Sequence, residues 1–73
     1  MANEEQLSIL KQGVHVWNKW REENSLDIDL KGADLRRINL TGANLCKVDL
    51  SRAILIETNL HGANLSEATL SLA

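Results

Sequence analysis

Leucine recurs at every fifth position over most of this chain. Between Ile28 and Leu72 the sequence divides without a gap into nine five-residue units, and the middle residue of each unit is leucine. The residue two positions before each leucine is small or β-branched, and the residue between them is Asp or Asn except at Ile54 and Thr69. A period of five matches neither the 3.6-residue period of an amphipathic helix nor the alternation of a strand. It indicates an internal repeat.

A chain that turns one corner per unit places all of these leucines on the same side. On a helix each residue turns by about 100°, so leucines five residues apart share no face. On a flat strand an odd spacing sends successive leucines to opposite faces. Four right-angle corners close a square, so we predict circuits of about twenty residues stacked about 4.8 Å apart. In that register Arg37 lies over Glu57, and Lys47 lies over Glu67.

These units resemble the repeats of the pentapeptide repeat family, in which A-[D/N]-L-x-x units build a right-handed quadrilateral β-helix. The resemblance covers Ile28 to Leu72, and only Ile54, Thr58 and Thr69 depart from the pattern at the first two positions of a unit. It implies that each leucine and the small residue two before it face inward. We therefore expect a mainly β fold, a short right-handed quadrilateral β-helix of about two and a quarter coils over residues 28–72.

The segment before the repeats has the pattern of one amphipathic helix over residues 3–24. Asn3 is a suitable N-cap, with Gln6 placed to reach back to it, and Asn24 can end the helix in the left-handed conformation. Its apolar residues form one broad face, which consists of Leu7, Ile9, Leu10, Val14, Val16, Trp17 and Trp20. A turn over residues 25–27 then leads into the first unit, so that residues 1–73 form a single domain.

We expect this helix to cap the first circuit, because that circuit would otherwise expose its leucines and its unpaired backbone edge. Trp17 and Trp20 are large enough to cover the top of a narrow square core, so we assign them a core-capping role. The alternative is that these two rings form a partner-binding patch or stack on nucleic-acid bases. No basic cluster surrounds them in the sequence, which favours the capping role.

The far end of the coil has no second helix after Leu72 to cover it. The last circuit is therefore expected to leave an open apolar end, which either stacks on a second copy as a homodimer or continues into a longer protein. We favour self-association. The candidate interface residues are Leu70 and Leu72 at the end, together with Ile54 and Ile56, which replace polar residues on an outer face. The alternative for the two isoleucines is that they are ordinary isolated surface residues.

Charge and composition narrow the function classes. The formal net charge is −2, and the repeat stretch carries five acidic and five basic residues, so no broad field favours nucleic acid or a membrane surface. Members of the family that mimic DNA and bind gyrase need a long acidic rod, so gyrase binding is the alternative function rather than the first choice. The single cysteine and the absence of an apolar leader favour a cytoplasmic protein. The family resemblance implies a bacterial one.

No constellation of residues indicates an enzyme. His15 and His61 lie far apart in the sequence and have no ligand partner at a recognised metal spacing, and Cys46 is expected at the surface beside Lys47. We therefore predict no catalytic residue, no cofactor, no metal and no small-molecule ligand. The expected function is a non-enzymatic structural or protein-interaction module, with the N-terminal assembly region of a larger protein as a further alternative.

Overall fold

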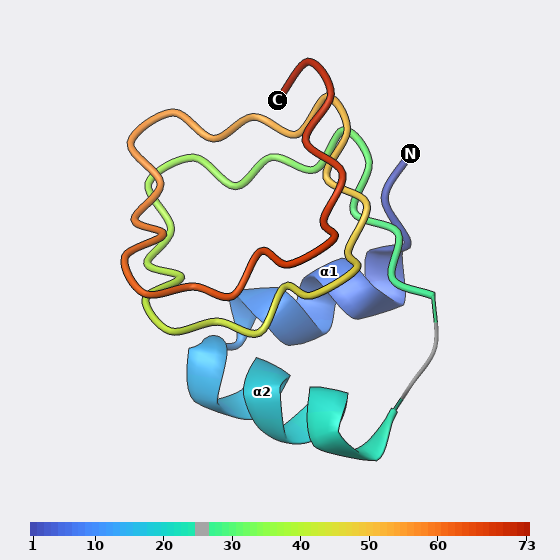
Figure 1. Cartoon of the computed structure of the whole chain (residues 1–73), viewed down its shortest axis with the longest axis vertical. Coiled ribbons are helices and arrows are strands. Elements are labelled where there is room, and N and C mark those ends of the chain that lie inside the picture. The colour runs from blue at the N-terminus through green and yellow to red at the C-terminus, as the bar shows by residue number, and fades with distance from the viewer. Residues whose placement is uncertain (25–26) are drawn as a thin grey trace.

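The computed structural model describes residues 1–24 and 27–73, and it consists of two helices followed by a coil. Helix α1 spans Glu4–Lys11 and helix α2 spans Val14–Glu23. Residues 28–73, here called the coil, wind into stacked circuits with both helices beside them (Figure 1). Residues 25 and 26 of the turn predicted before the first unit lie outside the described residues.

The prediction of one continuous helix over residues 3–24 is wrong, because the chain changes direction at Gly13. Gly13 has φ +119°, a value that residues with a side chain rarely adopt and that cannot continue an α-helix. A glycine within the apolar pattern of a helix can also permit close approach of another backbone, but no heavy atom lies within 4 Å of a Cβ built on Gly13. The glycine is needed for its backbone conformation. Asn24 likewise ends α2 in an extended conformation, not the left-handed one.

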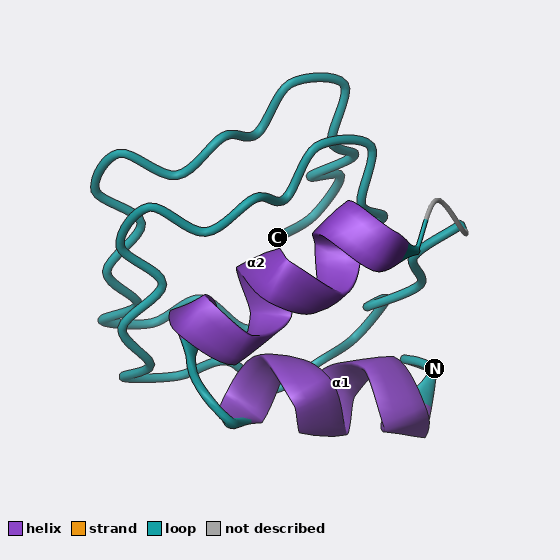
Figure 2. Cartoon of the chain, turned by 90° about the horizontal axis from the view of Figure 1, so that it is seen from below, coloured by secondary structure: helices purple, strands orange, loops and turns teal. Residues whose placement is uncertain are grey.

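The prediction of a mainly β fold is also wrong. Two helices are the only regular elements in residues 1–24 and 27–73, and the coil consists of turns and isolated bridges, so Figure 2 draws it entirely as loop. Two residues of each five-residue unit form a turn. Only one residue per unit then forms a bridge with the next circuit, which is too short for a strand, and the N–H of the fifth residue adds a single hydrogen bond.

Bridges between residues twenty apart stack the circuits in the predicted register. All of them are parallel, and they join Asp29 to Asp49, Asp34 to Ile54, Asn39 to Asn59, Asn44 to Asn64 and Asp49 to Thr69. The ion pair expected from this register is present, with Arg37 Nε 3.2 Å from Glu57 Oε1. The corresponding Lys47–Glu67 pair is not formed among the described residues.

Two features recur at the corners, a backbone conformation with positive φ and a hydrogen bond from a backbone N–H to a side chain. The last residue of every unit has a positive φ, and at six of the corners this residue is not glycine, as at Arg52 with φ 61°. In seven units the Asp or Asn side chain accepts a hydrogen bond from the N–H two residues later, as Asp49 Oδ1 does from Ser51. This short-range bond explains the Asp/Asn preference, since Asx turns of this kind stabilise a change of direction.

The apolar core runs through the first circuit and into the helices. The leucines of the first five units are fully buried, and so are Leu10 of α1 and Trp17 of α2. Ile28, Ala33, Ala43, Val48 and Ala53 complete the buried set. Thr58, the polar exception among the inward positions, is accommodated because its hydroxyl donates to the Leu35 carbonyl at 2.6 Å.

Two side-chain amides take the place of a preceding circuit at the helix end of the coil. Gln6 Nε2 donates to the Asp27 carbonyl at 3.1 Å, while Gln6 Oε1 accepts from the Asp29 N–H at 2.9 Å. On another side Asn18 donates to the Gly42 carbonyl and accepts from the Asn44 N–H. Gln6 therefore does not reach back to Asn3 as predicted, although the Asn3 side chain does accept from the Gln6 N–H.

Candidate interface at the open end of the coil

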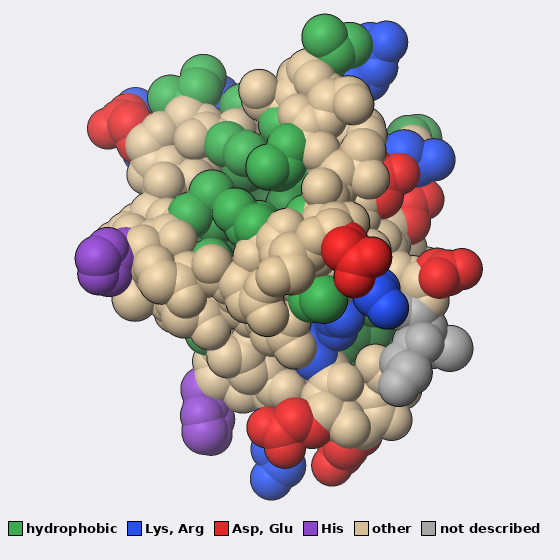
Figure 3. All heavy atoms as spheres, in the orientation of Figure 1, with side chains coloured by type: hydrophobic (Ala, Val, Ile, Leu, Met, Phe, Trp, Pro, Cys, Tyr) green, Lys and Arg blue, Asp and Glu red, His purple; other side chains and the backbone are tan. Residues whose placement is uncertain are grey.

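The inward leucines are less buried at the far end of the coil than at its helix end. Leu30, Leu35, Leu40, Leu45 and Leu50 are all 0% exposed. The leucines of the next three units, Leu55, Leu60 and Leu65, are only partly buried, and Leu70 is 42% exposed. Figure 3 shows the resulting apolar surface, in which hydrophobic side chains gather inside the ring of backbone. The far end of the coil, here called the open end, thus exposes part of its core.

The open end also presents backbone groups of fixed pattern. In each bridge, the N–H after the bridging residue and the C=O before it bond to the following circuit. At Asn44, for example, the Leu45 N–H donates to the Asn64 carbonyl, and the Ala43 carbonyl accepts from the Asn64 N–H. The last circuit of the described residues repeats this arrangement on its outer edge. Among the described residues, no bond to a further circuit is made by these groups, which are the N–H of Leu55, Leu60, Leu65 and Leu70 and the C=O of Ala53, Thr58, Ala63 and Ala68.

The predicted interface residues lie around this end but at different depths. Leu70 is the last of the inward leucines, and Leu72 is 77% exposed at the following corner, where its φ is 59°. Ile54 and Ile56 are 41% and 60% exposed on the outside of the last circuit. Sequence reasoning did not include Leu55, Leu60 and Leu65 in the interface. The twenty-residue period contains that information, because it shows which leucines have no circuit above them.

The two tryptophans lie at the opposite end. Trp17 is 0% exposed and its Nε1 donates to the Asn44 carbonyl at 2.8 Å. Trp20 is partly buried against the core, with its ring centroid 5.3 Å from that of Trp17. Arg21 lies over the Trp17 ring and donates to the carbonyls of Asn44 and Cys46. The helix end is therefore closed by both apolar contacts and hydrogen bonds, unlike the open end.

One charged cluster lies on an outer face of the coil. Arg36 makes a bidentate pair with Asp34, at 2.9 and 2.8 Å, and this hydrogen bonding lowers the pKa of Asp34 from 3.8 to about 2. A shallow hollow of about 730 Å³ adjoins the pair, and it is lined by Lys11, Asp34, Arg36, Arg37, Ile38 and Ile56. Both arginines are already paired with carboxylates, which leaves Lys11 as the cation of the hollow that makes no ion pair among the described residues.

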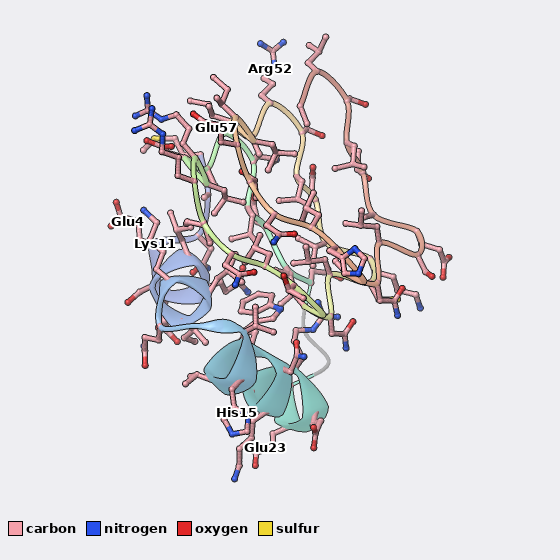
Figure 4. The ribbon with its side chains drawn as sticks, turned by 90° about the vertical axis from the view of Figure 1, so that its left-hand side faces the viewer. Glu4, Lys11, His15, Glu23, Arg52 and Glu57 are labelled. Atoms are coloured by element: carbon pink, nitrogen blue, oxygen red, sulfur yellow. The ribbon has the colours of Figure 1, made fainter. Side chains whose placement is uncertain are left out.

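The remaining reactive side chains do not assemble into a site. His15 lies on the side of α2 that points away from the coil (Figure 4), and His61 is exposed on the coil. Within residues 1–24 and 27–73, no three His, Cys, Asp or Glu side chains gather so as to hold a metal ion. The thiol of Cys46 is unpaired and half-buried. Neither α1 nor α2 has the length and apolar character that crossing a membrane would require.

These features define a repeat protein with one end capped by helices and the other end open. Residues 33–71 match the family described as pentapeptide repeats, in eight copies. The match covers more than half of the 73 residues, and the chain belongs to this family. Comparisons with curated proteins and with solved structures returned no match. Pentapeptide repeats are commonly structural or protein-interaction modules and are generally not enzymes.

Proposed function

We propose that this chain is a non-enzymatic interaction module that binds a second copy of itself through the open end. The observation that carries the proposal is the contrast along one core, from leucines that are 0% exposed to Leu70 at 42%. Exposed apolar surface next to unpaired backbone edges favours association, because covering it removes both from water. The helices occupy the other end, so the two copies meet through their open ends.

Gyrase binding by DNA mimicry finds no support in the shape or charge of the molecule. The longest dimension is 29 Å, and the acidic and basic residues of the coil balance. Duplex DNA carries about one negative charge per 1.7 Å of its axis. A neutral coil of this length does not reproduce such a charge distribution.

Measurement of the solution mass over a range of protein concentrations tests the proposal. The mass should rise from 8.1 kDa toward about 16 kDa as the concentration increases. Leu70→Lys should shift this equilibrium toward the monomer, because it places a charge in the contact. Val16→Lys is the matched control, since Val16 is 40% exposed and lies on α2 at the capped end.

Circular dichroism of both variants checks that each remains folded. A mass that stays at the monomer value at millimolar protein would contradict the proposal. Dissociation by Val16→Lys with no effect of Leu70→Lys would contradict it as well, because the contact would then lie on the helices.

A further inference from the structure

The geometry points to one specific register for the dimer: an antiparallel contact whose twofold axis passes beside Asn64. A residue that lies a given number of positions before Asn64 then faces the residue of the second copy that lies the same number of positions after Asn64. Asn64 faces Asn64, and Asn59 faces Thr69. This inference rests on the proposed self-association, and it adds which residues meet.

The backbone edge of the open end is complementary to itself in this arrangement. Each side presents an N–H one residue after the bridging position and a C=O one residue before it, and a further N–H lies three residues after the bridging position. The first two groups form the antiparallel pairing. Two antiparallel edges of this kind bond to each other around a non-hydrogen-bonded pair. The N–H groups of Leu60, Leu65 and Leu70 then donate to the carbonyls of Ala68, Ala63 and Thr58 of the second copy, respectively.

The rise of the coil excludes registers with a longer overlap. The chain climbs by one ladder spacing, about 4.8 Å, in each circuit, so the open end is a ramp. Two identical ramps fit face to face only where the low part of one meets the high part of the other. An axis midway between Asn59 and Asn64 would also align bridging residues. It would place Ser71 of the second copy against Arg52, whose N–H already bonds to Ser71 of its own chain.

Side-chain sizes agree with an antiparallel contact that aligns bridging residues, as the axis beside Asn64 does. Every inward leucine of the contact faces a smaller inward residue of the second copy, and the pairs are Leu60 with Ala68, Leu65 with Ala63, and Leu70 with Thr58. This alternation of large and small residues allows two apolar layers to interdigitate. A contact that set leucine against leucine would hold the backbones too far apart to bond.

The register also accounts for two unusual residues on the outer surface. Ile56 and Leu72 are the most exposed large apolar side chains of the coil, at 60% and 77%. They are numbered equally far from 64, so each covers the other across the contact. His61 lies opposite Glu67 in the same way, and these two groups can form a hydrogen bond.

Disulfide formation between single cysteines tests the register. In a Cys46→Ser background, Asn64→Cys should oxidise to a disulfide-linked dimer, because Cα atoms of a non-hydrogen-bonded pair are about 4.5 Å apart. Asn59→Cys alone should form at least tenfold less dimer under the same mild oxidation. The double variant Asn59→Cys with Thr69→Cys should restore the crosslink. Asn39→Cys, which occupies the same column as Asn59 in the first circuit, is the matched control.

The solution mass of each reduced variant separates the two possible failures. A doubled mass without the Asn64→Cys crosslink, or with faster crosslinking through Asn59→Cys alone, would overturn the register and leave self-association intact. A mass that remains at the monomer value in the Cys46→Ser parent would overturn the proposed function together with the register. Circular dichroism of the reduced proteins confirms that the cysteine variants are folded.

Discussion

At the scale of single residues, short-range bonds explain the composition of the repeat better than long-range charge does. The Asp or Asn before each leucine bonds to the N–H two residues later, so either side chain serves and the charge is incidental. Where Asp49 fills this position, the bond from Ser51 N–H lowers the pKa of Asp49. The Arg37–Glu57 pair has side chains 78% and 64% exposed, so it contributes about 0–1 kcal/mol and mainly reports the register.

Arg36→Gln should raise the pKa of Asp34 from about 2 toward 3.8, because the side-chain hydrogen bond from Arg36 is the largest cause of the depression. In the parent protein this carboxylate stabilises the fold above about pH 4, and its contribution is lost as the pH falls from 3.8 to about 2. An NMR titration of the Asp34 carboxyl measures the change directly. Arg37→Gln is the control, since Arg37 pairs with Glu57, and an equal shift in both variants would contradict the assignment.

At the scale of elements, the helices close the coil with side-chain amides that imitate peptide groups. Gln6 and Asn18 each donate to one backbone carbonyl and accept from one backbone N–H, in the coil or, for Asp27, directly before it. The bridging residues Asp29 and Asn44 therefore have partners for their N–H groups, although no circuit precedes them. The cap thus satisfies polar groups as well as covering the leucines.

Gln6→Ala should lower the free energy of unfolding by about 1–3 kcal/mol, because it leaves the Asp29 N–H and the Asp27 carbonyl without these partners. Urea denaturation at low protein concentration gives the value. Gln12→Ala is the matched control, since Gln12 is exposed and follows α1. If both variants unfold at the same urea concentration, the side-chain amide of Gln6 does not support the coil.

The sequence predicts the register of the coil, but it does not predict the secondary structure of its sides or the break in the helix. The five-residue period determines which residues stack, and the Arg37–Glu57 pair follows from it directly. The period does not show that the turn leaves a single bridging residue per side. Gly13 satisfies a helical apolar pattern equally well as a packing site or as a break, because both need a residue without a side chain. The partners of Gln6 are remote in sequence, so no local pattern indicates them.

At the scale of the whole molecule, the two ends of one core are in different environments. Leu45 and Leu65 occupy the same column, flanked by the bridge between Asn44 and Asn64. Leu45 is 0% exposed beneath a complete circuit, while Leu65 is only partly buried in the last one. The same side chain therefore contributes unequally to stability along the coil.

Leu45→Ala should cost about 2–5 kcal/mol, because it creates a cavity in a fully buried site. Leu65→Ala should lower the free energy of unfolding less, by a margin of about 1 kcal/mol or more, because a partly buried leucine removes less apolar area from water. Both values are measured by urea denaturation at a concentration where the protein is monomeric. The difference should shrink as the concentration rises, because association buries Leu65. Equal costs at low concentration would contradict the open end.

The amide mimicry of Gln6 and Asn18 has a consequence for protein design. Both side chains bond only to main-chain atoms, in the coil or at Asp27 directly before it, so these four bonds do not depend on the outward side chains of the first circuit. The apolar part of the cap depends on the inward leucines, which every array of five-residue units shares. Residues 1–24 should therefore cap another such array, provided that the graft preserves the spacing of the two amides and the leucines that pack with Leu10 and Trp17.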